Sequence, residues 1–128
     1  MKKLRRDICI FNYLIGNTDN HIKNLSLLYG ADLRTIRLAP AYDIISTQIY
    51  DSSTEDMAVS IGNTYNLHAI TRDSFAWEAR NVGLGQQMAM NRYDHMTAAF
   101  EKALFQACDT LQSQLPEVQE LAEGILHR

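Results

Sequence analysis

The chain has 128 residues, of which 46% are hydrophobic and 21% are charged, and its formal net charge at pH 7 is −3. These values are ordinary for one soluble globular domain, and the slight negative charge gives no electrostatic basis for binding nucleic acid. No apolar run approaches the ~20 residues that span a bilayer, and the start of the chain lacks the layout of a signal peptide. The only two cysteines, Cys9 and Cys108, lie in apolar helical patterns that indicate buried thiols in a reducing compartment. We therefore expect a cytoplasmic protein without a membrane segment.

The first helix is predicted over residues 3–15, where apolar residues recur near the 3.6-residue helical period. Its expected buried face consists of Leu4, Ile8, Phe11 and Ile15. Gly16 follows at the place where a helix commonly ends, because glycine adopts the left-handed conformation at little cost. A polar loop is expected over residues 17–24.

A β-hairpin is predicted next, from strands at residues 25–29 and 34–38, with a well-buried face on the first strand. Gly30, Ala31 and Asp32 supply the turn between them. Pro40 has no N–H for a strand ladder, so the pairing should end there. The segment from residue 41 to 45 then leaves the hairpin at the end where residue 24 enters it.

The remainder of the chain predicts one short strand and three helices. Residues 51–56 form a surface loop, residues 57–61 a strand, and residues 62–70 show no clear period. Thr71 is the predicted N-cap of a helix with Phe75, Ala79 and Val82 on one face. A long helix follows over residues 86–111, with a candidate break at 91–94 and a stripe made of Met96, Phe100, Ala103, Leu104, Ala107 and Leu111. Pro116 suits the first turn of a last helix, so the expected fold is mainly α with a small β-hairpin.

Three oxygen-bearing side chains stand out by their spacing. Asn24 lies five positions after Asp19, and Asp43 lies 24 positions after Asp19, beyond the hairpin. Phosphoryl transfer needs one carboxylate to orient the attacking hydroxyl, and an amide and a second carboxylate to hold magnesium on the triphosphate. Because a hairpin brings its outer ends within about 5 to 10 Å, we expect Asn24 and Asp43 to lie close together.

Two segments of the chain resemble those of a known protein family. They are Leu-Ile-Gly-Asn-Thr-Asp-Asn-His-Ile-Lys-Asn at 14–24 and Leu-Ala-Pro-Ala-Tyr-Asp-Ile-Ile at 38–45. They are similar to those of the HipA family, bacterial serine/threonine kinases that act as toxins in toxin–antitoxin pairs. Residues 57–62 resemble the short strand that the family carries next, and residues 70–84 its following helix. The resemblance covers nearly the whole chain and implies a protein-kinase-like C-terminal lobe.

The resemblance implies a role for each of the three residues. Asp19 would be the catalytic-loop aspartate, which accepts a hydrogen bond from the substrate hydroxyl. Asn24 would hold magnesium through its side-chain oxygen, and Asp43 would bridge magnesium to the phosphates of ATP. Ile44 and Ile45 follow Asp43, so the Phe-Gly switch of protein kinases is absent.

His21 and Lys23 match the family string as well, and they are candidate catalytic residues with open roles. Lys23 either meets the transferred phosphoryl group or pairs with Asp19. His21 either takes part in the site or is a packed residue that fixes the loop.

One departure from the family concerns the front half. HipA-like kinases are roughly three times as long, and their amino-terminal part supplies the loop that covers the phosphates and the lysine that contacts them. We therefore expect residues 1–128 to be a single C-terminal lobe without the nucleotide-clamping lobe, and without meaningful kinase turnover by itself. The implied partners are a HipB-like DNA-binding antitoxin, the front lobe, and a protein substrate such as an aminoacyl-tRNA synthetase.

Two other functions are considered. One is a non-catalytic module that binds an antitoxin or a separately encoded front lobe. An apolar patch larger than that of a typical monomer is expected for a lobe severed from its partner, and this surface separates the module from the catalytic lobe. The other is a metal-dependent hydrolase with Asp19, His21 and Asp43 as ligands. The hydrolase is the weakest of the three, because a lone histidine makes a poor transition-metal site.

Overall fold

The computed structural model describes residues 2–127, except for the side chain of Lys2. Its helices and strands follow one another as α1 (Lys2–Ile15), the 3₁₀ helix η1 (Ile22–Asn24), β1 (Leu27–Tyr29), β2 (Ile36–Leu38), β3 (Asp56–Ile61), β4 (Thr64–Asn66), α2 (Arg72–Asn81), α3 (Gln86–Leu111) and α4 (Val118–Leu126). The fold is thus mainly helical with two small antiparallel strand pairs. No helix within residues 2–127 is both long enough and apolar enough to cross a membrane.

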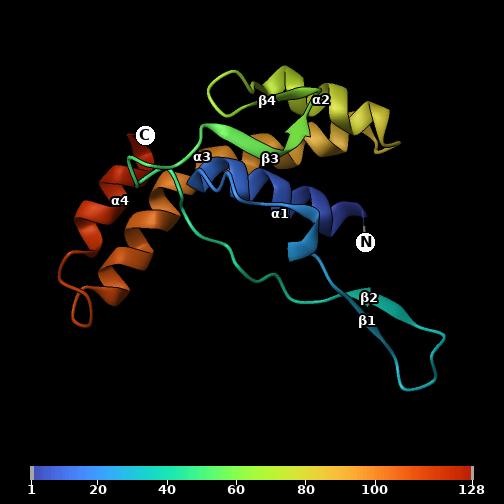
Figure 1. Ribbon diagram of the computed structural model, residues 1–128, viewed down its shortest axis with the longest axis horizontal. Helices are drawn as coiled ribbons and strands as arrows, with labels where there is room; N and C mark the ends of the chain where they lie inside the picture. Colours follow the sequence, from blue (N-terminus) through green and yellow to red (C-terminus); the bar gives the residue numbers. More distant parts are fainter. Residues whose placement is uncertain (1, 128) are drawn as a thin grey trace.

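The long helix α3 is the centre of the molecule, because it contacts α1, α2 and α4. α1 and α2 both pack on α3, and β3, β4 and α2 lie above α1 in the view of Figure 1. α4 folds back on the C-terminal end of α3, far from the hairpin β1–β2.

The main core lies where α1, β3, α2 and α3 meet. It is built from Ile10, Leu14, Met57, Ile61, Leu67, Ile70, Phe75, Met90 and Tyr93. The Phe75 ring is at the middle of an aromatic group, with centroids 5.3 Å from Tyr13 and 4.8 Å from Tyr93. Each fully buried aliphatic or aromatic side chain of this kind contributes about 1.5–3 kcal/mol to folding. A smaller cluster of Cys108, Val118 and Ala122 holds α4 to α3.

The predicted helix at residues 3–15 is confirmed, but its buried face is partly wrong. Leu4 and Phe11 remain 48% and 39% exposed, whereas Ile10 and Leu14 are buried. The helical period fixes the spacing of a buried stripe, but the positions of α3 and β3 decide which side of α1 it occupies.

The long helix is confirmed at residues 86–111, and the candidate break at 91–94 is wrong. Tyr93 is buried in the core, and Asp94 accepts two hydrogen bonds of 2.8 Å from the Arg72 guanidinium. These bonds lower the pKa of the Asp94 carboxyl. Both contacts fix the middle of α3 against α2. Leu111, predicted within the buried stripe, is 42% exposed because only α4 contacts that end of α3.

A second hairpin, β3–β4, includes a strand that the sequence analysis left irregular. Ile61 pairs with Thr64 across a turn made by Gly62 and Asn63, which both have a φ of +60°. Left-handed conformations at both central residues are typical of a tight β-hairpin turn. A side chain at Gly62 would also come within 2.6 Å of the Ser74 backbone, so α2 packs closely on this turn.

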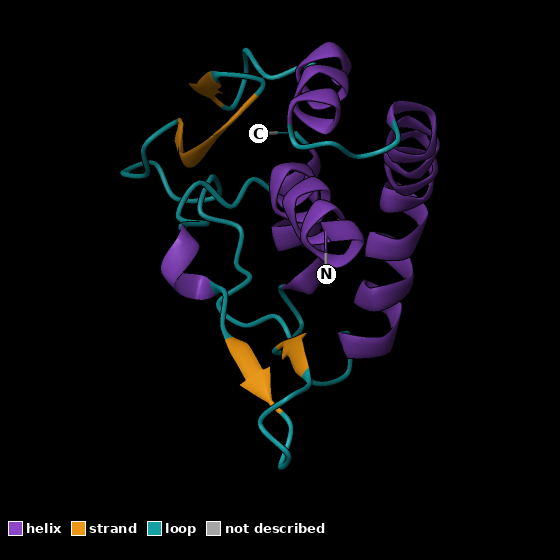
Figure 2. Ribbon diagram, turned by 90° about the vertical axis from the view of Figure 1, so that its right-hand side faces the viewer, coloured by secondary structure: helices purple, strands orange, loops and turns teal. Residues whose placement is uncertain are grey.

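The hairpin β1–β2 projects from the helical body in both ribbon views (Figures 1 and 2). Its strands pair in the predicted way, with Leu27 opposite Leu38 and Tyr29 opposite Ile36. The expected well-buried face on β1 is wrong, because all three β1 residues are exposed. No described element covers either side of this ribbon.

Candidate functional site

The loop that carries Asp19 is anchored to the body by Gly16 and Thr47. Gly16 has a φ of +71°, which turns the chain sharply at the end of α1. Its carbonyl accepts hydrogen bonds from the Thr47 N–H at 3.1 Å and from Thr47 Oγ1 at 3.0 Å. Thr47 Oγ1 in turn accepts from the Thr18 N–H at 2.9 Å and contacts Thr18 Oγ1 at 2.7 Å. One threonine therefore holds Gly16 and Thr18, two of the three residues that precede Asp19.

A buried pair of asparagines connects the same loop to the Asp43 segment. Asn12 and Asn17 are both 1% exposed. Asn17 Nδ2 donates to Asn12 Oδ1 at 2.6 Å and to the Asp43 carbonyl at 3.3 Å. Asn12 Nδ2 donates to the Ile8 carbonyl within α1. Because a buried amide must satisfy its hydrogen bonds inside the protein, this arrangement defines where the Asp43 backbone lies.

Asp19 and Asn24 lie on the exposed side of the loop. The Asp19 side chain is exposed, and its backbone carbonyl accepts from the His21 N–H at 2.9 Å and from Asn24 Nδ2 at 3.2 Å. The η1 turn that ends at Asn24 brings these groups together. Since the amide nitrogen of Asn24 is engaged, its oxygen Oδ1 is the atom left to bind a cation.

The Asp43 segment is held beside Lys23 and Ser26 by its neighbour Tyr42. Tyr42 Oη donates to the Lys23 carbonyl at 2.9 Å and lies 2.9 Å from Ser26 Oγ. The Ala39 N–H donates to the Ser26 carbonyl at 2.8 Å, which is the last hairpin contact before Pro40. The two outer ends of the hairpin are therefore side by side, as the spacing predicted.

Asp43 itself has a φ of +56°, in the left-handed region that non-glycine residues seldom adopt. Such a conformation persists only where the surroundings impose it, and it is found often at functional sites. Here the bond from Asn17 and the position of Tyr42 impose it. Asp43 is exposed, as is Asp19.

His21 and Lys23 differ in their surroundings. His21 Nδ1 is buried with no hydrogen-bond partner among residues 2–127, as are Asn17 Oδ1 and Ser46 Oγ. The hydrogen-bonding capacity of His21 Nδ1 is therefore not met by the packing around the loop. The described carboxylates do not approach Lys23 within ion-pair distance, so the pairing of Lys23 with Asp19 is absent from this structure and its amino group faces solvent.

The donor set of the loop suits magnesium and does not suit a transition metal. Across residues 2–127, His, Cys, Asp and Glu side chains nowhere gather in a group of three that could hold a metal ion. Asp19, His21 and Asp43 thus do not form the three-ligand site that the hydrolase alternative requires. A carboxylate from Asp43 and an amide oxygen from Asn24 are hard oxygen ligands, which magnesium prefers together with water and phosphate oxygens.

Four residues that position the site were not recognised from the sequence as site residues. Asn12, Asn17, Tyr42 and Thr47 act through contacts that span 5 to 31 residues along the chain. The one available signal was Asn12, a polar residue inside an apolar helical pattern. Such a residue is expected to find a buried partner when its face is covered.

A solved structure has the same architecture. The Shewanella oneidensis MR-1 HipA chain, in a structure titled as a complex of toxin–antitoxin system HipA, HipB and operator DNA, superposes with a TM-score of 0.83. The match covers 98% of this chain and 30% of the HipA chain, at 20% identity, and shows the shared fold.

The family model for the HipA-like C-terminal domain matches residues 3–104, which is most of the chain. This protein therefore belongs to the HipA-like C-terminal domain family. Two proteins of Sinorhizobium fredii (strain NBRC 101917 / NGR234) are also similar. "Putative kinase Y4mE" is 33% identical over 98 residues, which are 77% of this chain and 23% of the relative. "Putative kinase Y4dM" is 32% identical over 120 residues, which are 86% of this chain and 29% of the relative. The chain thus spans less than a third of the length of each of these proteins.

Proposed function

We propose that this chain is the catalytic lobe of a HipA-like serine/threonine kinase, the toxin of a toxin–antitoxin pair, which transfers the γ-phosphoryl group of ATP to a protein hydroxyl. The observation that carries the proposal is the bond from Asn17 to the Asp43 carbonyl, at 3.3 Å. It joins the loop of Asp19 and Asn24 to the segment of Asp43, and so it supports the convergence of the three side chains that phosphoryl transfer needs.

Each residue has a distinct task in the proposed reaction. The Asp19 carboxylate accepts a hydrogen bond from the substrate hydroxyl and aims its oxygen at the γ-phosphorus. Asn24 Oδ1 and the Asp43 carboxylate would hold Mg²⁺, which supplies neutralisation of the charge on the phosphates. The Lys23 amino group lies on the exposed side of the loop, where it can meet the transferred phosphoryl group. The new bond joins the hydroxyl oxygen to phosphorus while the bond to ADP breaks.

The reaction needs a second lobe to clamp the nucleotide, so turnover by this chain alone is expected to be negligible. By resemblance the protein substrate belongs to the translation machinery, such as an aminoacyl-tRNA synthetase. The thiols of Cys9 and Cys108 are free, which suits a reducing compartment, and the cytoplasm is the proposed location.

Nucleotide binding tests the proposal without the second lobe. We expect titration calorimetry with Mg-ATP to give weak binding, which Asp43→Asn abolishes by removing the carboxylate. Asp51→Asn, on an exposed loop, is the matched control and should bind as the unsubstituted chain does. Equal binding by Asp43→Asn would contradict the proposal. In a chain joined to a front lobe, Asp19→Asn should abolish phosphorylation of the protein substrate.

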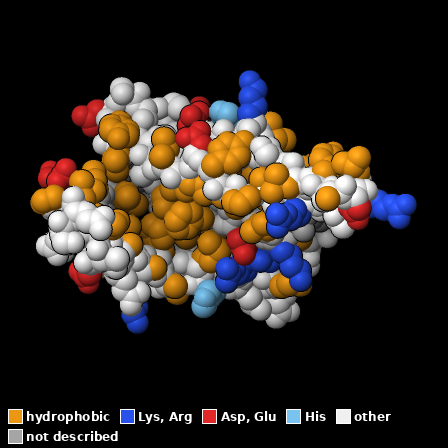
Figure 3. Space-filling view, turned by 90° about the horizontal axis from the view of Figure 1, so that it is seen from below, with side chains coloured by type: hydrophobic (Ala, Val, Ile, Leu, Met, Phe, Trp, Pro, Cys, Tyr) orange, Lys and Arg blue, Asp and Glu red, His pale blue; other side chains and the backbone are white. Residues whose placement is uncertain are grey.

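The second candidate function is a non-catalytic interaction module, and one observation favours it. The hairpin β1–β2 exposes large apolar side chains, namely Leu27, Leu28, Tyr29, Leu33 and Ile36, which are 38–78% exposed. A shallow groove between α1 and α3 adds Phe11, Met96 and Phe100. Hydrophobic side chains also gather on the face seen from below (Figure 3). Apolar surface of this kind suits contact with a front lobe or a HipB-like antitoxin.

Co-elution distinguishes the two candidates. An interaction module forms a stable complex with the antitoxin or front lobe whether or not Asp19 is intact. A catalytic lobe also gives phosphate transfer in that complex, and the transfer is lost with Asp19→Asn.

A further inference from the structure

A pocket of about 230 Å³ lies between α1, β3, α2 and α3, apart from the three proposed catalytic side chains. Its floor is formed by core residues, namely Ile10, Met57, Ile61, Phe75, Met90 and Tyr93. The volume is below the roughly 300–1,000 Å³ of pockets that hold drug-sized molecules, but it is more than ten times the ~10–15 Å³ of cavity that one water molecule needs. It therefore suits a single large apolar side chain rather than a nucleotide.

The rim of this pocket carries charges of both signs, and Arg5 is the cation there that has no ionic partner among the described residues. Arg6 is paired with Asp7 at 2.7 Å, and Glu78, which keeps its negative charge, is oriented by a hydrogen bond of 3.0 Å from the Gly62 N–H to its Oε2. Arg5 also lines the pocket and is exposed, and none of the described carboxylates lies within ion-pair distance of it. A ligand that fits both parts has an apolar group for the floor and an anionic group for Arg5.

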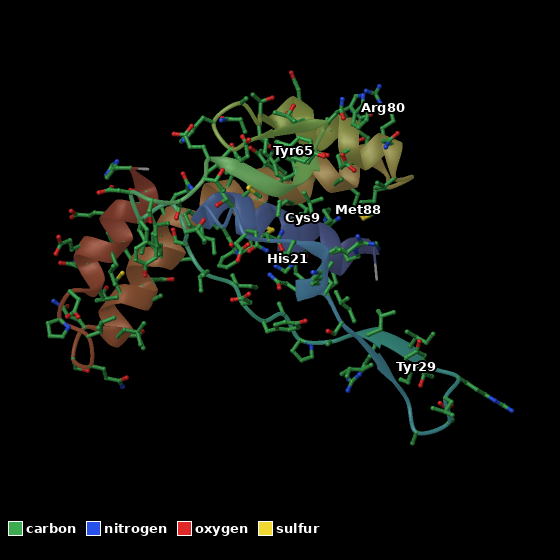
Figure 4. The ribbon with its side chains drawn as sticks, viewed as in Figure 1. Cys9, His21, Tyr29, Tyr65, Arg80 and Met88 are labelled. Carbon is green, nitrogen blue, oxygen red and sulfur yellow. The ribbon has the colours of Figure 1, made fainter. Side chains whose placement is uncertain are left out.

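The mouth of the pocket lies beside the proposed catalytic loop. Asn20, the residue after Asp19, is one of the residues that line it. Figure 4 labels Cys9 on α1, another lining residue, below β3 in that view and well away from Tyr29 on the projecting hairpin. Since consecutive residues of an extended chain are spaced about 3.3–3.6 Å apart, residues that flank a hydroxyl at Asp19 come within reach of the pocket.

We propose that this pocket binds the protein substrate, by receiving an apolar side chain that flanks the phosphorylated residue while an acidic side chain of the same segment meets Arg5. The proposal rests on the proposed kinase function for the choice of a polypeptide as ligand. It adds a recognition rule, which is an acidic residue and a large apolar residue near the target hydroxyl. Val59 and Val82, 46% and 42% exposed at the edge of the pocket, extend the apolar contact to the substrate backbone.

The test uses fluorescein-labelled peptides with a central serine, in which a leucine and an adjacent glutamate are moved through the positions on either side. We expect one register to bind most tightly by fluorescence anisotropy. Replacing its leucine by alanine should weaken binding about tenfold or more, because the buried apolar area is lost. Arg5→Glu should weaken the binding of the peptide that contains glutamate. Arg80→Glu is the matched control and should leave this binding unchanged, because Arg80 is exposed on α2 and does not line the pocket.

A variant that fills the pocket gives a second readout. Ala79→Phe places a ring in the pocket and should abolish peptide binding, whereas Ala98→Phe on the exposed side of α3 should not. Because Ala79 is 5% exposed and the larger side chain can unfold the protein, protection of Cys9 is measured on the unsubstituted chain as well. The bound peptide should slow methylthiolation of Cys9 and leave the rate at the buried Cys108 unchanged.

Burial raises the pKa of the Cys9 thiol, so the labelling is run at alkaline pH. Binding that is independent of leucine position, or a Cys9 labelling rate that no peptide changes, would overturn the proposal. The Mg-ATP titration is run in parallel. If the chain binds the peptide but not the nucleotide, the kinase proposal is wrong and peptide binding by the pocket stands. If it binds the nucleotide but not the peptide, only the proposal for the pocket is wrong.

Discussion

Two parts of the segment between α1 and β3 contrast strongly in their packing. Residues 16–18 are buried and held by Thr47, whose hydroxyl and N–H make contacts of 2.7 to 3.1 Å to Gly16 and Thr18. The hairpin at residues 27–38 has exposed side chains on both faces and only its own strand pairing. One part is fixed by the body of the protein, and the other is not.

The two parts differ in whether this chain alone stabilises their position. The anchored part sets the position of the loop that carries Asp19 and Asn24 within this chain. An isolated two-stranded ribbon has little stability of its own, and apolar residues exposed on it gain stability only when something covers them. The four predictions below test the contrast by removing contacts from each part.

The largest effect is expected for Thr47→Val, which keeps the shape of the side chain and removes its hydroxyl. The Gly16 carbonyl loses one donor, and the Thr18 N–H is left without an acceptor. An unsatisfied buried group costs about 1–3 kcal/mol, so we expect a loss of about 3 kcal/mol in the free energy of unfolding, measured by urea denaturation. Thr110→Val, on the exposed side of α3, is the control and should change it by less than about 0.5 kcal/mol. A small effect at Thr47 would mean that the loop is not anchored there.

The second effect concerns the buried asparagine pair. Asn17→Ala leaves Asn12 Oδ1 without its donor and frees the Asp43 carbonyl. We expect a loss of about 2 kcal/mol in stability and weaker Mg-ATP binding, because the Asp43 backbone is no longer held. Asn91→Ala, exposed on α3, is the control. Intact nucleotide binding in Asn17→Ala would show that the Asp43 segment is positioned by Tyr42 alone.

The helices were predictable because their signals are local. The residues that signal a helix end, Gly16, Thr71 and Pro116, lie close to that end in the sequence. The structure has a helix at each predicted place. The buried faces were less predictable, since Leu4 and Phe11 have the right spacing but remain partly exposed, and Phe11 contacts Phe100 of α3 only at the edge of the core. The β3–β4 hairpin was missed although Gly62-Asn63 is a recognised hairpin dipeptide.

For the candidate site, the sequence predicts Asp19, Asn24 and Asp43 but not the groups that hold them. Asp19, Asn24 and Asp43 share a spacing that phosphoryl transfer explains, and their catalytic roles stay a prediction. The groups that hold them are not local, since Asn17 reaches across 26 residues to Asp43 and Thr47 across 31 to Gly16. A threonine in a polar segment gives no signal of its own that it will meet a glycine carbonyl so far away in sequence.

A smaller effect is expected for Asp43→Gly, in the opposite direction. Asp43 has a φ of +56°, a conformation that glycine adopts without the steric cost borne by other residues. The gain is partly offset by the greater freedom of glycine in the unfolded chain, so we expect stability to rise by up to about 1 kcal/mol. The same substitution should abolish Mg-ATP binding, because the carboxylate is gone. A loss of stability would mean that the Asp43 side chain supports the fold and is not kept for binding.

The smallest effect on folding is expected in the hairpin. Leu28→Thr with Ile36→Thr keeps residues that favour strands and removes two exposed apolar side chains, so the free energy of unfolding should change by less than about 0.5 kcal/mol. Association with a front lobe or antitoxin should weaken, measured by co-elution of the two chains, because the covered apolar area is lost. Thr35→Ser in the same ribbon is the control, since it keeps the hydroxyl that donates to Asp32 and leaves Leu28 and Ile36 in place, and it should leave the association intact. Destabilisation comparable to that of Thr47→Val would show that the hairpin is part of the folded body, and the contrast between the two parts would no longer hold.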